Sequence, residues 1–241
     1  MREGAPKAVT AISRTLQEQI GRGLLACGSQ LPAERKLSEL FATTRVTLRE
    51  ALLQLESEGL IYREERRGWF VSPPRLDYNL MQRSHFHAMV SAQGRVPTTE
   101  VISARLQPAS ASVCERLQLP ALSSVIQICR GRRIDGRLVL YVEHYLNPQY
   151  FPQILAFDLT QSITELYARH YDLHYGRVRF EIVPTALPIE AATTLKVSTG
   201  SPGLRIDRVN YDQHQRLIDC DLEYWRHDAI HIGVDVGEYV V

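Results

Sequence analysis

The stretch LPAERKLSELFATTRVTLREALLQLESEGLIYREERRGWFV, from Leu31 to Val71, decides the fold of the first third of the chain. Its centre predicts an amphipathic helix, because apolar residues recur there at helical spacing: Leu48, Ala51, Leu52 and Leu55. The hydroxyl of Thr44 can cap the first turn of this helix, and Gly59 is a typical residue just beyond a helix end. The opposite side of the first turns is polar and carries two arginines, Arg45 and Arg49, with little acid beside them.

Two more helices and a hairpin surround this helix in the sequence. An earlier helix is predicted to end near Gly28, because one apolar stripe runs through Val9, Ile12, Leu16, Ile20 and Leu24. A short helix follows over Ala33–Phe41, and the alternating segment LIYREERRGWFVS predicts a hairpin with a charged turn. Such a helix before residues 44–59 and a basic hairpin after them are what a winged helix-turn-helix requires.

The remainder of the chain is organised differently. The prolines of SPPRLDYNL predict a semi-rigid linker, so we expect domains at residues 1–72 and 83–241 joined by residues 73–82. In the second domain, Asp135-Gly136 lies between two β-rich runs and is a strong hairpin signal. A similar order of short helix, strand, tight turn and strand recurs further along the chain. Repeated units usually pair into one sheet, which predicts an α+β domain around a largely antiparallel sheet.

The composition is that of a folded chain without an export signal. The 241 residues carry a net charge of +1, with 44% hydrophobic and 23% charged residues, ordinary values for a chain that buries a core. Residues 1–75 hold 12 Lys/Arg against 9 Asp/Glu, whereas residues 76–241 hold 16 against 18, so the basic excess lies in the first third. The four cysteines form no C-x-x-C pair, and no apolar run approaches the roughly 20 residues that span a bilayer. We therefore expect a reduced, cytoplasmic protein with no membrane partner, no cofactor and no metal.

The polar side of the 44–59 helix has residues that can read DNA. The first turns of a recognition helix lie deepest in the major groove. Arginine binds O6 and N7 of guanine with two parallel hydrogen bonds, and threonine or valine methyl groups can contact the thymine methyl. The candidate base-reading residues are Arg45, Val46, Thr47 and Arg49. Taken alone, two arginines more often form an ordinary solvated helix face.

The Leu31–Val71 stretch as a whole resembles the winged helix-turn-helix of the GntR family of bacterial transcription regulators. The matching elements are the LP-x-E-R-x-L turn, the R-x-T-x-R-x-A-L-x-x-L recognition helix, the E-G-L-I segment and an arginine-glycine wing. The resemblance implies DNA contacts for nine residues: Arg35, Thr44, Arg45, Val46, Thr47, Arg49, Arg66, Arg67 and Gly68. Two positions depart from the family pattern, since Arg66 replaces a second wing glycine and Trp69 replaces a smaller residue. We expect Trp69 to be a hydrophobic lid on the hairpin.

Residues 83–238 resemble the effector-binding domain of the HutC subfamily, called UTRA, whose fold is similar to that of chorismate lyase. The resemblance rests on QGRVPTTEVIS, the R-x-R-x-x-D-G motif of Arg130–Gly136, VEHYL, DLTQSITELYARHY and YWRHDAI. It implies an effector pocket with seven candidate residues: Arg130, Arg132, Glu143, Ser162, Tyr167, Asp219 and Trp225. A regulator of this kind is expected to be a homodimer that places two recognition helices on a palindromic operator.

The chemistry of several of these positions can be argued from the residues themselves. Arg130 and Arg132 alternate along one predicted strand, so both point to one face and can grip an anion. Glu143 lies on the returning strand and is expected to be a cross-strand neighbour. Ser162 is expected to begin the helix SITELYARHY, whose free amides form a natural phosphate or phosphonate site. The simpler alternative is a structural arginine-glutamate pair beside an ordinary N-cap serine.

Several segments, including SITELYARHY and VNYDQHQRLIDCDLEYWRHDAI, look especially similar to the regulators of 2-aminoethylphosphonate utilisation genes. That resemblance implies that the two arginines and Ser162 hold the phosphonate, while Glu143 or Asp219 faces the ammonium group. An acid on the same strand can instead pair with Arg208 or Arg226; the three acids that alternate there are Asp219, Asp221 and Glu223. A different anionic effector, such as a sugar phosphate or a carboxylate, is the alternative ligand.

Two other classes of protein compete with this interpretation. An enzyme has weak support, because no G-x-S-x-G elbow, P-loop or G-x-G-x-x-G motif is present. The histidine pairs His170/His174 and His227/His231 lack the further ligand that makes a metal site persuasive. A DNA-binding architectural protein without an effector is the other rival. We predict a transcription regulator that is not an enzyme and that binds operator DNA under the control of a small anionic metabolite.

Overall fold

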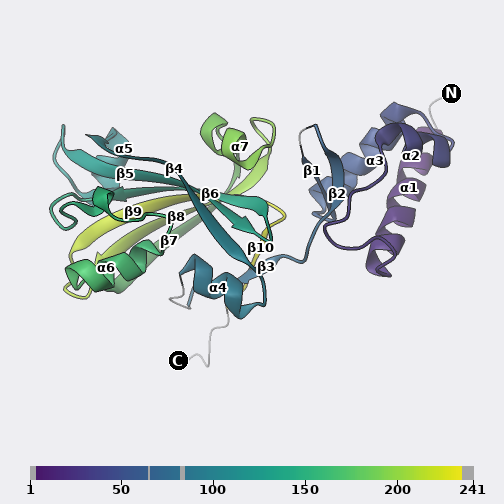
Figure 1. Cartoon of the computed structure of the whole chain (residues 1–241). Coiled ribbons are helices and arrows are strands. Elements are labelled where there is room, and N and C mark those ends of the chain that lie inside the picture. Colours follow the sequence, from purple (N-terminus) through teal and green to yellow (C-terminus); the bar gives the residue numbers. More distant parts are fainter. Residues whose placement is uncertain (1–3, 65, 82–84, 235–241) are drawn as a thin grey trace, which may run out of the picture. The chain divides into compact units, whose positions relative to one another are not determined.

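Two structural units make up the chain in the computed structural model, which describes residues 4–64, 66–81 and 85–234. The first unit extends to Arg75 and includes His227–Ala229, and the second comprises the rest of the chain from Leu76 onward. The first unit holds three helices and a hairpin, and the second is built on a six-stranded antiparallel sheet (Figure 1). This is the α+β architecture that the sequence predicts.

The three helices of the first unit are α1 (Gly4–Gly21), α2 (Glu34–Leu40) and α3 (Arg45–Ser57). The prediction that the first helix extends to near Gly28 was wrong, because the helix ends at Gly21 and Leu24 is 73% exposed. Two closely spaced glycines cause the early end: Gly23 adopts a φ of +72°, which is outside helical geometry and favours glycine. Leu24 therefore continues the apolar spacing without continuing the helix.

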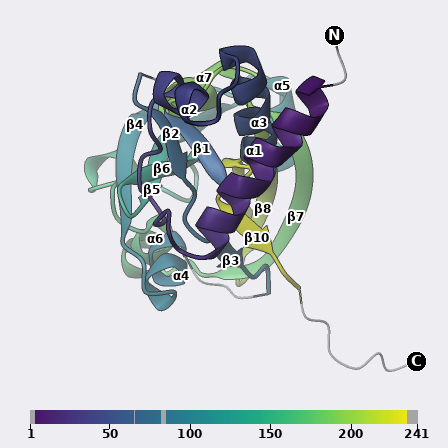
Figure 2. The ribbon, with the colours of Figure 1, turned by 90° about the vertical axis from the view of Figure 1, so that its right-hand side faces the viewer.

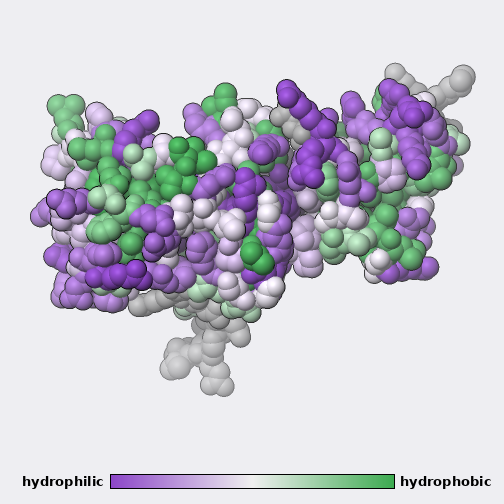
Figure 3. All heavy atoms as spheres, viewed as in Figure 1, coloured by the Kyte–Doolittle hydropathy of each residue, from purple (hydrophilic) through white to green (hydrophobic). Residues whose placement is uncertain are grey.

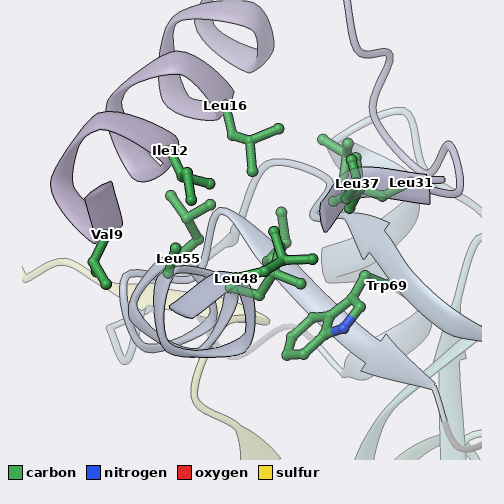
Figure 4. Close-up of a cluster of buried hydrophobic side chains, with 12 residues drawn as sticks. Val9, Ile12, Leu16, Leu31, Leu37, Leu48, Leu55 and Trp69 are labelled. Atoms are coloured by element: carbon green, nitrogen blue, oxygen red, sulfur yellow. The ribbon is translucent and has the colours of Figure 1, made fainter. Parts of the chain in front are cut away.

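Helix α3 begins as the sequence predicts, with a threonine cap. The Thr44 hydroxyl accepts a hydrogen bond of 3.2 Å from the Thr47 amide, and Gly59 follows the helix with a φ of +77°. The apolar face is buried, with Leu48, Ala51, Leu52 and Leu55 all at 0% exposure. They pack against α1 and against Trp69 of the hairpin (Figure 4). Burial of Trp69 in this cluster confirms its expected role as a hydrophobic lid.

Replacing Thr44 with alanine should lower the stability of the first unit by about 1 kcal/mol, the usual cost of losing an N-cap side chain. The reason is that the Thr47 amide loses its acceptor at the first turn of α3. Serine should restore most of the loss, because its hydroxyl can occupy the same place. Thermal unfolding of the Thr44→Ala and Thr44→Ser variants tests this, and equal stabilities for the two would argue against the cap.

The hairpin consists of β1 (Ile61–Glu64) and β2 (Gly68–Val71), paired antiparallel. A preceding loop adds backbone hydrogen bonds to β2, including one of 2.8 Å from the Leu31 amide to the Trp69 carbonyl. At the turn, Arg66 takes a φ of 63°, the left-handed region that favours glycine. This conformation explains why glycine suits that position.

The sheet of the second unit has the order β4-β5-β6-β9-β8-β7, all antiparallel. Its strands are β4 (Pro97–Pro108), β5 (Ser124–Ile134), β6 (Arg137–Leu146), β7 (Tyr175–Ala186), β8 (Pro202–Asp212) and β9 (Leu217–Arg226). The repeat predicted from the sequence is confirmed, because the β5-β6 and β8-β9 hairpins meet at β6 and β9 in one sheet. The long strands β4 and β7 form its opposite edges (Figure 2).

Helices cover both faces of this sheet. Helices α5 (Ala111–Leu117) and α7 (Ile189–Leu195) pack on the face that carries Cys129, Tyr141 and Tyr145. Helix α6 (Ile163–Tyr171), with the short 3-10 helix Ile154–Ala156, packs on the other face. Figure 1 shows α5 and α7 on the side of the sheet opposite α6. Residue parity along each strand therefore decides which helices a side chain meets.

The expected linker contains regular structure. Residues Leu76–Tyr78 form strand β3, which pairs in parallel with β10 (Ile230–Ile232), and α4 follows over Phe86–Ala92. Leu76 is fully buried, so β3 is anchored in the second unit. The pairing joins segments about 150 residues apart, and nothing local in SPPRLDYNL indicates it.

Candidate functional site

The exposed side of α3 carries the residues predicted to read DNA. The Arg45 side chain makes no ion pair or hydrogen bond with any other residue that the structure describes, and Val46 is 79% exposed. A shallow hollow on this side is lined by Arg45, Val46, Arg49, Glu50 and Leu53. Thr47 lies on the same turn, where its hydroxyl contacts that of Thr44 at 3.0 Å. A free arginine beside apolar surface on the first turn of a helix suits a base edge in the major groove.

The other arginines predicted to contact DNA have acidic partners. Arg35 pairs with Glu39 at 3.0 Å, and both side chains are largely exposed. Arg49 pairs with Glu34 at 2.9 Å, and Arg67 forms an ion pair with Glu64. The expectation of little acid beside Arg49 was wrong, because Glu34 reaches it from a separate helix.

The turn of the hairpin is exposed. Arg66 and Arg67 are exposed, and Gly68 has a φ of 97°. Figure 3 shows hydrophilic side chains over the tip of this hairpin. Its position beyond the recognition helix is that of a wing, so the nine residues predicted to contact DNA lie on α2, α3 and the wing.

A cavity of about 720 Å³ lies in the second unit. Its walls come from β5, β6, β7, β8 and β9, from the start of α6, and from residues in and near β3 and α4. The charged and hydroxyl side chains that line it are Arg130, Arg132, His144, Ser162, Thr164, Arg177, Arg179, Arg208, Asp221 and Glu223. Aromatic residues complete the wall: Tyr78, Phe86, Tyr175, Phe180 and Trp225. A cavity of this size and mixed character suits a small polar metabolite.

The hydrogen-bond donors of Arg130 are used within the protein. Its guanidinium donates to the Gln161 carbonyl at 2.9 Å, to the Leu159 carbonyl at 3.3 Å, and to Nε2 of His144 at 2.8 Å. These contacts hold the loop that ends at Ser162, the N-cap of α6. Ser162 begins α6 as the sequence predicts, accepting from the Glu165 amide at 3.3 Å. Arg130 therefore positions the first turn of α6 at the cavity.

His144 connects Arg130 to an acid. Its Nε2 accepts from Arg130, so its Nδ1 is the protonated nitrogen that donates to Asp221. Burial lowers the pKa of His144 to about 4, even though the charge of Asp221 opposes this shift. Burial opposes ionisation of Asp221, but His144 and Arg208 together lower its pKa. The result is a neutral histidine between a buried cation and a buried carboxylate.

Arg132 is a cation of the cavity whose side chain remains available to a ligand. Within the described residues it forms no hydrogen bond or ion pair, and its Nε is buried without a partner. Its guanidinium carbon lies 4.7 Å from the centre of the Phe86 ring. Burial lowers the pKa of Arg132 to about 10, and it stays charged at neutral pH. An anionic ligand group would supply the hydrogen bonds that this guanidinium lacks.

The opposite charge in the cavity comes from β9. Glu223 accepts hydrogen bonds from Arg208 at 3.1 Å and from the Trp225 indole at 2.8 Å. Asp221 lies 3.7 Å from Nε of Arg208. The hypothesis that an acid of this strand pairs with Arg208 is therefore confirmed for Glu223. Asp221 and Glu223 line the cavity beside the arginines, so it can take a ligand that carries both charges.

Three predicted pocket residues do not line this cavity. Glu143 was expected beside the arginines, but the strand register places Glu143 opposite Cys129, and Val142 opposite Arg130. The Glu143 carboxylate points to the other face of the sheet, where it accepts from Tyr141 at 3.0 Å and Tyr145 at 2.6 Å. It therefore cannot face a ligand in this cavity.

Tyr167 and Asp219 lie behind the cavity wall. Tyr167 is 1% exposed and its ring centre lies 4.2 Å from that of Phe151. Asp219 is fully buried and accepts from Tyr175 at 2.9 Å and from Asn210. The four remaining candidates, Arg130, Arg132, Ser162 and Trp225, are brought together at the cavity.

Sequence reasoning missed the residues that the β3 and α4 segment supplies. Tyr78, His85, Phe86 and His87 line the cavity, and Phe86 is the ring on which Arg132 stacks. His85 caps α4 and contacts Glu165 of α6 at 2.8 Å. The predicted linker of residues 73–82 included Tyr78, whereas HFHAM lies within the predicted effector domain, and its aromatic and histidine residues were a usable signal.

Asp219 gives the second unit a testable pH dependence. Burial and the charge of Asp221 raise the pKa of Asp219 to about 7. A raised pKa in the folded state means that stability present below the unfolded value of about 4 is lost as pH rises through 7. The stability gained by the Asp219→Asn variant over the natural protein should therefore be roughly 3 kcal/mol larger at pH 8 than at pH 5. Calorimetric unfolding at both pH values tests this, and an equal change at both would contradict it.

The histidine pairs noted in the sequence have ordinary contacts. His170 stacks on Phe157 with ring centres 4.2 Å apart, and His227 donates to the Glu56 carbonyl at 2.9 Å. Across the described residues, no group of three or more His, Cys, Asp or Glu side chains could hold a metal ion. In the same part of the chain, no helix is both long and apolar enough to cross a membrane.

Comparison with known proteins adds two family matches. Residues 8–71 match the model for bacterial regulatory proteins of the gntR family, and residues 92–231 match the UTRA domain. The chain is 28% identical to the HTH-type transcriptional regulator YihL of Escherichia coli strain K12, over 89% of this chain and 91% of that protein. It is 29% identical to the HTH-type transcriptional repressor NagR of Bacillus subtilis strain 168, over 90% and 89% of the two chains.

Another relative carries the name "Probable fructoselysine utilization operon transcriptional repressor", from Escherichia coli strain K12. It is 24% identical over 93% of this chain and 92% of that protein. Among solved structures, PhnF from Mycobacterium smegmatis matches with a TM-score of 0.66 and 22% identity, covering 95% of this chain and 100% of that chain. This match supports the two-part fold described above.

Proposed function

Because the chain belongs to the GntR family of bacterial regulatory proteins and carries a UTRA domain, we propose that a small anionic metabolite controls its binding to operator DNA. The chain is a transcription regulator and not an enzyme. One observation carries the proposal about the effector: the guanidinium of Arg132, unpaired within the described residues, in a cavity of about 720 Å³. A buried cation without a partner is costly, and an anion relieves that cost.

The DNA half of the proposal assigns distinct roles to the residues of α3 and the wing. Arg45 is the base reader, since it is free and lies on the first turn. Val46 and Thr47 contact neighbouring base edges, while Arg66 and Arg67 of the wing contact phosphates. Neutralisation of phosphates supplies most of the affinity, which should fall steeply as the salt concentration rises.

We propose 2-aminoethylphosphonate as the effector. Its phosphonate would meet Arg132 and the free amides at the start of α6, which Ser162 caps. Its ammonium group would face Glu223 and Asp221, which line the same cavity. These acids replace Glu143 and Asp219 in that role because neither of those side chains lines the cavity.

A sugar phosphate or sugar-derived amine is the second candidate. The aromatic walls at Tyr78, Phe180 and Trp225 can pack against a sugar ring, and a relative is named for fructoselysine utilisation. Calorimetric titration of the purified protein separates the candidates. Heat from 2-aminoethylphosphonate but not from glucosamine 6-phosphate supports the first, and the reverse supports the second. Binding of neither would remove the effector half of the proposal.

The connection between cavity and DNA follows from chain order. Residues 78–81 and 85–87, which line the cavity, follow soon after Arg75, the last residue of the first stretch of unit 1. A ligand that contacts these residues can bias the recognition helix only if it prefers one arrangement of the chain over another.

We also propose that the protein acts as a homodimer on a palindromic site. Apolar residues exposed on the edge strand β4 are consistent with a covered surface: Val101, Ile102 and Leu106 are 37%, 48% and 58% exposed.

A further inference from the structure

Glu34 is an acid within the surface that we assign to DNA, and it lies where three elements meet. It is the first residue of α2, and its two carboxylate oxygens have different partners. Oε2 accepts from Arg49 of α3 at 2.9 Å, and Oε1 accepts from the Trp69 indole of β2 at 3.0 Å. Burial opposes ionisation of Glu34, but these hydrogen bonds lower its pKa below the ordinary value. The carboxylate therefore joins the recognition helix to the wing.

The surroundings of Glu34 are strongly basic. It lies in a cleft of about 360 Å³ between α3 and the wing, where four arginines contribute to the walls: Arg49, Arg63, Arg66 and Arg67. The guanidinium of Arg63 lies 5.9 Å from the centre of the Trp69 ring. A DNA backbone that passes from the recognition helix to the wing would meet this cleft. On charge alone, an acid placed here should weaken DNA binding.

We propose that Glu34 is a positioning residue for DNA recognition, which fixes the Arg49 guanidinium and the wing in the geometry that contacts the operator. The proposal rests on the DNA-binding function proposed above. Each carboxylate oxygen receives one donor, so a single side chain orients both the α3 arginine and the hairpin. Preorganisation of this kind lowers the entropy that is lost when arginines are ordered on DNA. Trp69 connects the wing to Glu34, because its indole N–H donates a hydrogen bond to that carboxylate.

The Glu34→Gln variant tests this role. A glutamine presents one carbonyl oxygen and one amide nitrogen, so it can accept from Arg49 or from Trp69 but its nitrogen opposes the other donor. The matched control is Glu39→Gln, which removes the same charge from the same helix at an exposed pair with Arg35. Binding is measured by fluorescence anisotropy on a duplex that the natural protein selects from a random library. Thermal unfolding and circular dichroism establish that each variant is folded.

The two hypotheses predict changes of opposite sign. If Glu34 positions Arg49 and the wing, Glu34→Gln should bind the selected duplex about tenfold more weakly, the effect of losing one charge-assisted hydrogen bond. Glu39→Gln should bind equally or slightly more tightly, since an acid has been removed from a DNA-binding surface. If Glu34 is only an adjacent charge, both variants should bind more tightly than the natural protein. That outcome would overturn the proposal.

A second variant keeps the test independent of how well Glu34→Gln folds. Trp69→Phe keeps an aromatic ring in the core, although a smaller one, and removes the indole donor to Glu34. It should weaken binding several-fold and lose hydroxyl-radical protection where the wing lies, while protection at the recognition helix persists. Unchanged affinity and protection in this variant would also overturn the proposal. Absence of selected duplexes for the natural protein would instead refute the DNA-binding function, and the positioning role with it.

Discussion

Replacing Arg45 with alanine is expected to abolish the preference of the protein for its operator while leaving its fold intact. The Arg45 side chain makes no hydrogen bond or ion pair within the described residues, so the variant should unfold at nearly the same temperature. A bidentate arginine-guanine contact contributes roughly 1–3 kcal/mol of discrimination, so affinity for the operator should fall about 100-fold towards the non-specific level. Anisotropy titrations on operator and scrambled duplexes at one salt concentration measure this loss.

The matched control is Arg22→Ala, which removes an exposed arginine that lies just after α1. It should lower affinity for both duplexes slightly and equally, because only a long-range charge is lost. If Arg45→Ala behaves in the same way, Arg45 is a phosphate contact or a solvated side chain rather than a base reader.

Replacing Arg132 with methionine should uncouple the effector from DNA. The variant keeps much of the packing against Phe86 but loses a buried cavity arginine that is free to bind an anion. We expect affinity for the effector to fall roughly 100-fold, since a buried charge-assisted pair contributes a few kcal/mol. DNA binding without effector should stay at the level of the natural protein. Calorimetry measures the affinity for the effector, and anisotropy measures the affinity for DNA.

Arg133 supplies the control for this variant, because it is adjacent in sequence but lies outside the cavity. Arg133 pairs with Glu100 at 3.3 Å and donates to the Gly136 carbonyl. Arg133→Met should keep effector binding within about twofold, since exposed ion pairs contribute little. Equal losses in both variants would indicate a general effect of charge, and full effector binding by Arg132→Met would place the anion elsewhere.

The winged unit could be predicted from sequence because its signals are local. The spacing of Leu48, Leu52 and Leu55 indicates the buried face of α3, and Thr44 and Gly59 indicate where the helix begins and ends. The error at the end of α1 has the same origin, because Leu24 continues the apolar spacing beyond Gly21 and Gly23. The partner of Arg49 could not be predicted, since Glu34 reaches it only once α2 and α3 are packed.

The cavity was harder to predict because it depends on strand register and distant pairing. The hairpin at Asp135-Gly136 was recognised, but the register that sends Glu143 to the opposite face was not. His144, one residue further along, has the parity that Glu143 was assumed to have. The parallel pairing of β3 with β10 brings Tyr78 to the cavity, and no local pattern encodes it.

Arg130 is hydrogen-bonded within the protein whereas Arg132, among the described residues, is not, and this difference has a simple physical cause. Both side chains point to the same face, as strand alternation predicts. Arg130 lies beside His144 and the Leu159 and Gln161 carbonyls, so its donors are used within the protein. Arg132 lies nearer the α4 side, where Phe86 offers a ring but no acceptor. Sequence spacing places two cations, whereas their neighbours decide which one can bind a ligand.

The most direct test of effector-controlled DNA binding is one anisotropy experiment at fixed salt. The protein is titrated onto DNA from upstream of its own gene, with and without saturating 2-aminoethylphosphonate. The account predicts selective binding whose affinity changes at least tenfold with the compound, a coupling of about 1.4 kcal/mol. Arg132→Met should bind the same DNA without responding. Selective binding that is indifferent to this compound and to sugar phosphates would contradict effector control, and no selectivity under any condition would contradict DNA recognition itself.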